Sequence, residues 1–357
     1  MATSKIRVLV VDDSALMRQV LSQALAADPA IDVVGTAPDP YVARDKIKAL
    51  HPDVLTLDVE MPRMDGLAFL ERLMRARPMP VVMVSSLTEA GCDVTLRALE
   101  LGAIDFVTKP RVDVRERIHE VTAEMIDKVK AAAGARLFPR VPPVTTSPVT
   151  PRPALFLTTD TVVAIGASTG GTEALREVLT ALPADAPGVV VVQHMPERFT
   201  RAFAERLDRL CTVRVKEAED GDRVLAGHVL IAPGNYHLRV VRDGALVRAR
   251  LGQDPPVNRH RPSVDVLFHA AAEALGQNAV GVIMTGMGSD GARGLLAMRQ
   301  AGARTIAQDP ESCVVFGMPR EAIALGAAER VVPLPHIADG VLAMIREREP
   351  ATAGRRS

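Results

Sequence analysis

The chain has 357 residues, with 43 Lys and Arg against 43 Asp and Glu, so its formal net charge is zero. This length favours two domains, and the charge balance argues against a protein that binds nucleic acid or a membrane surface through bulk positive charge. No stretch approaches the roughly 18 apolar residues that a spanning helix needs, and the polar N-terminus is not a signal peptide. Three scattered cysteines are typical of free thiols in a reducing compartment. We therefore expect a cytoplasmic protein without direct membrane insertion.

Apolar runs alternate with amphipathic helices in the first part of the chain, which predicts a parallel sheet with crossover helices. Helices are expected at 15–26 and 112–133, the second with apolar residues at helical spacing. We predict a doubly wound, flavodoxin-like domain over residues 1–133. Its five expected strands are 6–11, 33–36, 54–57, 81–84 and 105–108.

Polar residues follow four of these strands. Asp12 and Asp13 follow the first, Asp58 the third and Ser85 the fourth, while Lys109 closes the fifth. The carboxyl ends of parallel strands meet at one edge of a sheet, where ligands bind. Clustered carboxylates need a cation, and Mg²⁺ suits such oxygen ligands. Lys109 could then hold a phosphoryl oxygen, and Asp58 is the best-placed acceptor for a phosphoryl group.

Taken singly, each of these residues is more commonly structural. For example, Asp13 or Ser14 could cap the helix that follows. All five standing at strand ends is much harder to explain by chance.

The segments VLVVDDSALMR, LTLDVEMPRMDGL, VVMVSS and GAIDFVTKP resemble the phosphoacceptor receiver domain of bacterial response regulators over about residues 5–125. The resemblance implies that a chemotaxis histidine kinase phosphorylates Asp58. It also implies that Mg²⁺ is bound by Asp13, Asp58 and the backbone carbonyl of Glu60, with Asp12 nearby.

The same resemblance gives Ser85 and Phe106, with Lys109, the places of the family's switch residues. A phosphate would draw Ser85 toward it and let Phe106 turn inward.

Six prolines fall between residues 139 and 153, among Thr, Ser, Val and Arg. Proline lacks an amide donor and cannot continue a helix or a central strand. We predict an extended linker over residues 134–159.

A second α/β domain is expected over residues 160–349, followed by a disordered tail at 350–357. Between 213 and 250 the pattern changes to short alternating runs with turns at Asp220-Gly221 and Asp243-Gly244, which predicts antiparallel hairpins. The clearest strands are 162–165, 189–193, 280–284, 303–307 and 328–332.

The first of these strands ends in the glycine-rich turn GASTGG at 166–171, which allows three interpretations. A dinucleotide site would need an acidic residue at the end of the next strand, where His194 stands instead. A nucleophile elbow would expose Ser168 within G-x-S-x-G. Thirdly, Ser168 could be an ordinary turn or cap residue and His194 a structural loop histidine.

The elbow interpretation gains support from two further strand ends. His194 follows the neighbouring strand, and Asp290 follows the strand 280–284. His194 could take the Ser168 proton, and Asp290 could orient the imidazole. Backbone amides after Ser168 and in the glycine-rich loop 286–288 could hold an oxyanion. The predicted reaction is acyl transfer to water through Ser168.

The segments GASTGG, VVVQHMP, LIAPGNYHL, VNRHRPSVDVLF and TGMGSDGARGL resemble the catalytic domain of the chemotaxis receptor methylesterases, the CheB family. The resemblance implies removal of methyl groups from receptor glutamates, with release of methanol, and deamidation of certain receptor glutamines. It places the nucleophile, base and acid at Ser168, His194 and Asp290, and the oxyanion amides at Thr169 and Met287. The substrates would be methyl-accepting chemotaxis receptors, and no cofactor is expected for the hydrolysis.

The basic loop 258–263 could meet acidic receptor side chains, or could be an exposed loop whose Ser263 or Asp265 caps the helix 264–275. His228 and His237 are expected to be structural. We expect a monomer whose unphosphorylated receiver blocks the catalytic edge. The rival hypotheses are a receiver fused to a binding module and a nicotinamide oxidoreductase. A DNA-binding output is disfavoured because no recognition helix with a basic face is evident.

Overall fold

The computed structural model describes residues 5–61, 64–86, 88–109, 115–138 and 161–347. The chain divides into two compact units, residues 1–142 and 143–357, which are taken separately below. From residue 139 to 159 the expected linker lies outside the described residues, as does the expected tail.

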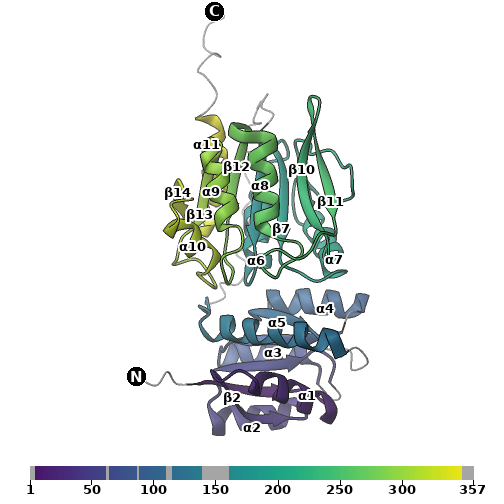
Figure 1. The fold of residues 1–357 in the computed structure, drawn as a ribbon. Helices are drawn as coiled ribbons and strands as arrows, with labels where there is room; N and C mark the ends of the chain where they lie inside the picture. Colours follow the sequence, from purple (N-terminus) through teal and green to yellow (C-terminus); the bar gives the residue numbers. More distant parts are fainter. Residues whose placement is uncertain (1–4, 62–63, 87, 110–114, 139–160, 348–357) are drawn as a thin grey trace, which may run out of the picture. The chain divides into compact units, whose positions relative to one another are not determined.

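The first unit is a five-stranded parallel sheet in the order β2-β1-β3-β4-β5, with connecting helices around it (Figure 1). The fold class expected for this part of the chain is confirmed. Its strands are β1 (Ile6–Val11), β2 (Ile31–Ala37), β3 (Val54–Asp58), β4 (Val81–Ser85) and β5 (Asp105–Thr108). Its helices are α1 (Ala15–Ala26), α2 (Pro40–Leu50), α3 (Gly66–Ala76), α4 (Glu89–Glu100) and α5 (Arg115–Ala133).

The central strands explain why this sheet is parallel. Every residue of β3 and β4 is buried, as a strand covered on both faces requires. Strand β2 begins two residues earlier than predicted, because the buried Ile31 is followed by the exposed Asp32, which hides its start in the sequence. The strand order reverses between β1 and β3, so the crevice for a ligand opens at their carboxyl ends.

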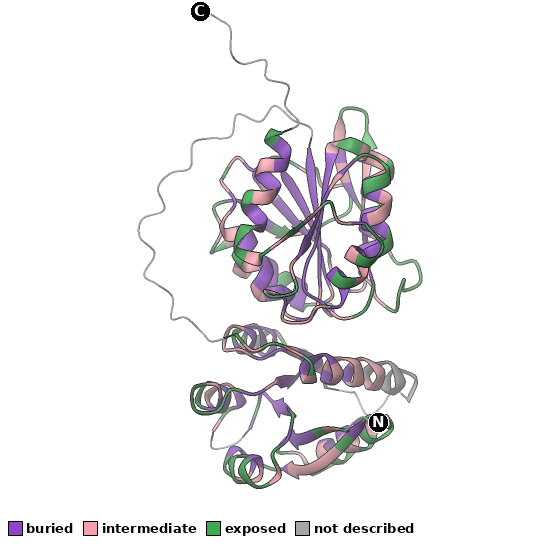
Figure 2. Cartoon of the chain, turned by 90° about the vertical axis from the view of Figure 1, so that its left-hand side faces the viewer, coloured by how far each residue is buried: buried purple, intermediate pink, exposed green. Residues whose placement is uncertain are grey.

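The second unit is a seven-stranded sheet in the order β14-β13-β12-β6-β7-β9-β8, in which all neighbouring strands pair in parallel. Buried strands form its centre, with partly exposed helices on both faces (Figure 2). Its strands are β6 (Val162–Ala167), β7 (Gly188–Gln193), β8 (Arg214–Glu217), β9 (His228–Ile231), β12 (Ala279–Ile283), β13 (Arg304–Gln308) and β14 (Arg330–Val332), and the separate hairpin is β10 (His237–Asp243) with β11 (Leu246–Gly252). Its helices are α6 (Gly171–Thr180), α7 (Phe199–Asp208), α8 (Val264–Leu275), α9 (Ala292–Gln300), α10 (Met318–Ala324) and α11 (Ile337–Arg346), with short 3-10 turns at Gly276–Asn278 and Leu334–His336.

The predicted hairpins between 213 and 250 are only half right. The turn at Asp243-Gly244 does join an antiparallel pair, β10 and β11. The turn at Asp220-Gly221, however, connects β8 and β9, which pair in parallel inside the main sheet. The three apolar residues of β9 are fully buried, whereas β8 lies at the sheet edge, where one open face produces the alternation that resembles a hairpin.

The order β12-β6-β7 sets the three central carboxyl ends side by side. All three strands are buried along their whole length. Helix α8 packs against α9 and the hairpin, which covers one face of this centre. The turns that follow these strands are therefore anchored to the buried centre of the sheet.

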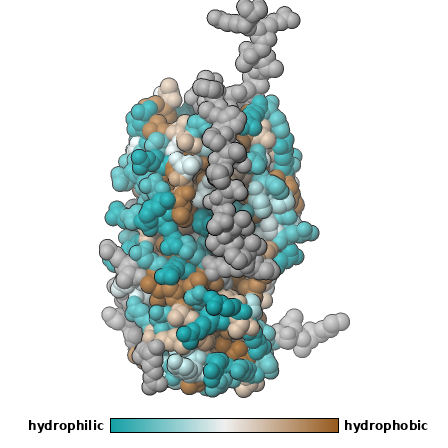
Figure 3. Space-filling model, turned by 180° about the vertical axis from the view of Figure 1, so that it is seen from behind, coloured by the Kyte–Doolittle hydropathy of each residue, from teal (hydrophilic) through white to brown (hydrophobic). Residues whose placement is uncertain are grey.

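On the face seen in Figure 3, most of the described surface is hydrophilic, and apolar residues occur in smaller groups. Among the helices of the described ranges, none has the length and apolar character to cross a bilayer.

Candidate active site

The first unit gathers the expected acidic residues at the carboxyl ends of β1 and β3. Oxygen atoms of Asp12, Asp13 and Asp58 lie within 4.8 Å of one another. Asp12 and Asp58 are fully buried, whereas Asp13 is exposed. Ser14, rather than Asp13, caps α1 by accepting from the Met17 amide at 3.3 Å. Asp13 therefore keeps its carboxylate for the pocket.

One lysine partly balances this negative charge. The ammonium of Lys109 lies 2.8 Å from Asp58 Oδ1 and 3.7 Å from Asp12 Oδ2. Burial raises the pKa of Asp58 to about 6, against the hydrogen bond from Lys109, which lowers it. Burial also raises the pKa of Asp12. The pocket therefore holds more carboxylates than one ammonium can neutralise.

Two buried oxygens indicate where a cation would go. Asp12 Oδ2 and Asp58 Oδ2 have no hydrogen-bond partner among the described residues. Buried carboxylate oxygens without a donor are costly, and hard oxygens of this kind suit Mg²⁺. The residues present therefore fit the expected magnesium ion.

The expected switch residues both lie near this pocket. The Ser85 hydroxyl is buried and accepts from the Thr95 hydroxyl at 2.6 Å. Phe106 is also buried, and the ammonium of Lys128 lies 5.0 Å from the centre of its ring. The aromatic side chain is thus already turned inward, while Ser85 is held by α4.

In the second unit, Ser168 stands in the turn between β6 and α6. Its amide donates to Thr285 O at 3.0 Å, which ties the turn to the end of β12. Gly170 has a φ of +77°, and a Cβ there would lie 2.6 Å from Val314. A Cβ on Gly171 would lie 2.1 Å from Gln193 Oε1. The space that a side chain at either glycine would need is filled by Val314 or Gln193 of the same chain, not left open for a ligand. This weighs against the dinucleotide interpretation.

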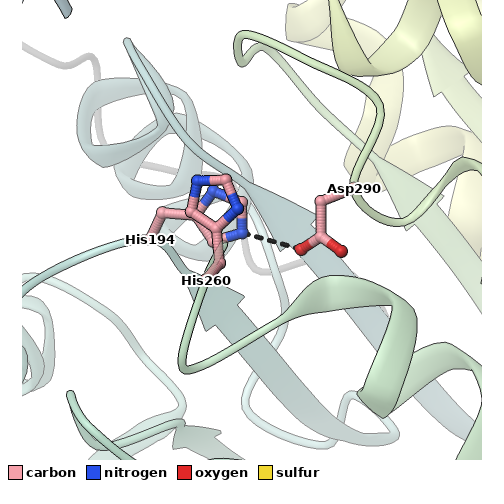
Figure 4. A group of neighbouring side chains, drawn as sticks. All are labelled: His194, His260 and Asp290. Carbon is pink, nitrogen blue, oxygen red and sulfur yellow. Dashed lines mark hydrogen bonds and ion pairs between the residues drawn. The ribbon is translucent and has the colours of Figure 1, made fainter. Parts of the chain in front are cut away.

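His194 follows β7 and pairs with Asp290. Its amide donates to Ala167 O at 3.1 Å, next to Ser168 in the chain. Its Nε2 lies 2.8 Å from Asp290 Oδ2 (Figure 4). Its Nδ1 is buried and has no hydrogen-bond partner among the described residues. Within the same ranges the Ser168 hydroxyl makes no hydrogen bond to His194, so the serine and base lie at one edge but are not yet paired.

Asp290 is the most heavily bonded carboxylate of this edge. It accepts from the Asn258 side-chain amide at 2.7 Å and from the Ser263 hydroxyl at 2.7 Å. The first amides of α8, of Val264 and Asp265, donate to it at 2.6 and 3.3 Å. Although burial alone would raise its pKa, the hydrogen bond and charge of His194 hold the pKa of Asp290 well below its usual range. Asp290 is therefore ionised near neutral pH.

This result corrects one of the two interpretations of the basic loop, in which Ser263 or Asp265 caps the helix. The side chain of Ser263 makes no capping hydrogen bond to α8, and Asp290 performs that role from the loop that follows β12. Asp265 instead accepts from Gly294 N at 2.7 Å, at the start of α9. A capping residue 26 positions away leaves no local signal in the sequence.

The structure also brings in a residue that the sequence analysis left unassigned. The ring of His260 stacks on that of His194, with centroids 3.7 Å apart and planes inclined by 7° (Figure 4). His260 belongs to the basic loop, which was expected to be either a contact for acidic side chains or a solvated loop.

The two residues expected to supply the oxyanion amides are Thr169 and Met287. Thr169 follows Ser168 directly, and its carbonyl accepts from the Thr285 hydroxyl at 3.0 Å. Met287 stands in the loop after β12, where a Cβ on the preceding Gly286 would lie 2.7 Å from Ser168 Cβ. Gly286 O accepts from the Gly317 and Met318 amides at 3.0 and 2.8 Å, which holds this loop. The loop therefore approaches the serine closely.

Comparisons with known proteins find a matching family for each of the two units. Residues 163–341 match the family model described as CheB methylesterase, and residues 8–121 match the response regulator receiver domain. A protein-glutamate methylesterase/protein-glutamine glutaminase of Bordetella bronchiseptica is 61% identical over 96% of this chain and 98% of its own. One of Salmonella typhimurium is 60% identical over 96% and 97%. The solved catalytic domain of Thermotoga maritima CheB methylesterase is 42% identical, covers 52% of this chain and 98% of its own, and has a TM-score of 0.51.

Proposed function

The chain belongs to the CheB methylesterase family, and from that premise we propose that it is a phosphorylation-regulated serine hydrolase acting on chemotaxis receptors in the cytoplasm. It hydrolyses glutamate methyl esters to glutamate and methanol, and it deamidates certain receptor glutamines. The relatives carry both activities in their names.

The observation that carries the mechanism is the state of the His194 ring. Its Nε2 donates to Asp290, so in the neutral ring Nδ1 is the unprotonated nitrogen, and it is buried without a partner among the described residues. A base needs such a free lone pair beside its nucleophile. Ser168 stands at the end of the adjacent strand.

The proposed reaction proceeds in two halves. Ser168 Oγ attacks the ester carbonyl while His194 takes its proton, and the amides of Thr169 and Met287 hold the oxyanion. The protonated His194 then gives its proton to the methoxy oxygen as the C–O bond breaks, which releases methanol, or to the amide nitrogen of a glutamine as the C–N bond breaks, which releases ammonia. Water repeats the sequence on the acyl-enzyme and releases glutamate.

Asp290 stabilises the charge that His194 gains. The carboxylate accepts from Nε2 in the resting state, and the same contact becomes an ion pair when the imidazolium forms. Its other donors fix both of its oxygens, so little rearrangement is needed during the reaction.

Regulation would enter through the first unit. A histidine kinase would phosphorylate Asp58, whose buried position and Lys109 contact support this role. Asp12, Asp13 and Asp58, with the carbonyl of Glu60, would hold Mg²⁺, which supplies charge neutralisation for phosphoryl transfer. Ser85, whose hydroxyl accepts from Thr95 of α4 in this state, would move toward the phosphate and pass on the change.

Methanol release from methylated receptors tests the proposal. Ser168→Ala should abolish release, whereas Ser289→Ala, an exposed serine of a neighbouring loop, should not. A fluorophosphonate should label the wild type and Ser289→Ala but not Ser168→Ala. Full turnover by Ser168→Ala would refute the nucleophile.

Asp58→Asn should remove the stimulation of methanol release by a small phosphodonor with Mg²⁺ and leave basal turnover. Asp32→Asn, at an exposed position of β2, serves as its control. Stimulation that survives in Asp58→Asn would place the phosphorylation elsewhere.

A further inference from the structure

The stacked ring of His260 is the feature of the second unit that the proposed mechanism does not use. Its centroid lies 3.7 Å from that of His194, and the planes are nearly parallel. His194 is almost buried, with a side-chain exposure of 7%. One face of the proposed base is therefore covered by a second imidazole.

The backbone that delivers His260 is strained. Val257 and His260 exchange two backbone hydrogen bonds, of 3.0 and 2.9 Å, around a tight turn. The two residues between them, Asn258 and Arg259, have φ values of +50° and +69°. Residues other than glycine rarely adopt this conformation, and they keep it only where surrounding contacts enforce it.

Those contacts lead to both members of the proposed dyad. The side-chain nitrogen Nδ2 of Asn258 lies 2.7 Å from Asp290 Oδ1 and 2.7 Å from Asp265 Oδ2. Two residues later, His260 lies on His194. The turn at residues 257–260 thus contacts the Asp290 carboxylate through the Asn258 side chain and the His194 imidazole through the His260 ring.

We propose that His260 is a positioning residue that holds the His194 ring in its working orientation, an inference that rests on the proposed function. The torsion that rotates an imidazole about its Cβ–Cγ bond has broad minima, so a hydrogen bond at one corner leaves the ring free to tilt. A flat ring stacked on it at 3.7 Å opposes that tilt. Nε2 then stays on Asp290, and the direction of the Nδ1 lone pair is fixed with it.

Metal chelation is a poorer account of the same cluster. Ligand atoms of His194, His260 and Asp290 lie within 4.8 Å of one another. However, a metal binds in the plane of an imidazole at about 2.0–2.1 Å. Two parallel rings 3.7 Å apart do not share such a point without reorientation.

The test compares the full-length wild type with four variants in methanol release from methylated receptors: His260→Ala, His260→Phe, Ser168→Ala and the control His228→Ala. His228 lies at the start of β9, at the opposite end of the strands from the site. His260→Ala should lower kcat by about 10- to 100-fold, because small displacements of a catalytic group cost this much, and should change KM little. His260→Phe should recover most of that loss, since phenyl offers the same flat face. Thermal melts of each variant check the fold.

The outcomes separate the two proposals. If Ser168→Ala stays active, the proposed function fails. If Ser168→Ala is inactive but His260→Ala matches the wild type, only the positioning role is overturned. That role is also overturned if folded His260→Phe is as slow as His260→Ala, or if KM rather than kcat changes.

Discussion

Replacing Asp290 should affect both catalysis and stability, because this carboxylate has two roles. It accepts from His194 at 2.8 Å, and it caps α8 from outside the helix. The variants Asp290→Asn and Asp290→Ala separate the catalytic role from the capping role. The asparagine keeps one acceptor oxygen, at the Oδ1 position that faces the Ser263 hydroxyl and the Asp265 amide, whereas the alanine removes every acceptor.

The expected size of the stability effect follows from the partners left behind. Losing a helix cap costs about 1 kcal/mol. The buried side chain of Ser263 would lose its acceptor, at about 1–3 kcal/mol, whereas Asn258 keeps Asp265 as an acceptor. Asp290→Ala should therefore destabilise the second unit by about 3 kcal/mol. At about 2–4 °C per kcal/mol for a unit of this size, its melting temperature should fall by about 10 °C.

The catalytic effect should appear in both variants. An asparagine amide group facing Nε2 favours the ring tautomer protonated on Nδ1, which cannot accept the serine proton. A loss on the order of 10⁴ in kcat is expected.

Calorimetry and methanol release, measured on the same preparations, test this reasoning. Ser168→Ala is the control that should lose activity with an unchanged melting temperature. A melting temperature of Asp290→Ala within about 1 °C of the wild type would refute the capping argument. Normal kcat in Asp290→Asn would refute the proposed dyad.

Two further outcomes are expected. Because the pKa of Asp58 is raised to about 6, the metal-free folded state binds a proton that the unfolded state releases. Its contribution to stability should rise by about 2 kcal/mol as the pH falls from about 7 to about 4. Melts of the first unit at several pH values should show this gain in the wild type and not in Asp58→Asn, and Mg²⁺ at pH 7 should raise the melting temperature of the wild type only. Gly170→Ala should destabilise the second unit by about 2 kcal/mol or more, because φ is +77° and the new Cβ would lie 2.6 Å from Val314; a chemical denaturation curve that matches the wild type would contradict this.

Local patterns were sufficient for the architecture and for where each candidate side chain stands along the chain. Continuous apolar runs such as residues 81–84 predict buried parallel strands, and the polar residue after each run then lies at the carboxyl edge. Asp12, Ser168 and His194 could be proposed from this rule alone. The rule uses only sequence neighbours, so it needs no knowledge of packing.

The same rule fails where strands lie at a sheet edge. Strand β8 alternates because one of its faces is open, and the turn that follows it resembles a hairpin turn. Only the pairing of β8 with β9 shows that the two run in parallel. Local composition cannot distinguish these cases, because alternation reports exposure and not direction.

The sequence by itself determined the two α/β units and the residues that stand at their strand ends. Tertiary structure decided what those residues touch. Asp290 caps a helix that begins 26 residues before it, and His260 lies on a histidine 66 positions away. These contacts join segments that no periodicity links. They depend on how α8 and its preceding turn pack over the sheet, and packing is a property of the whole fold.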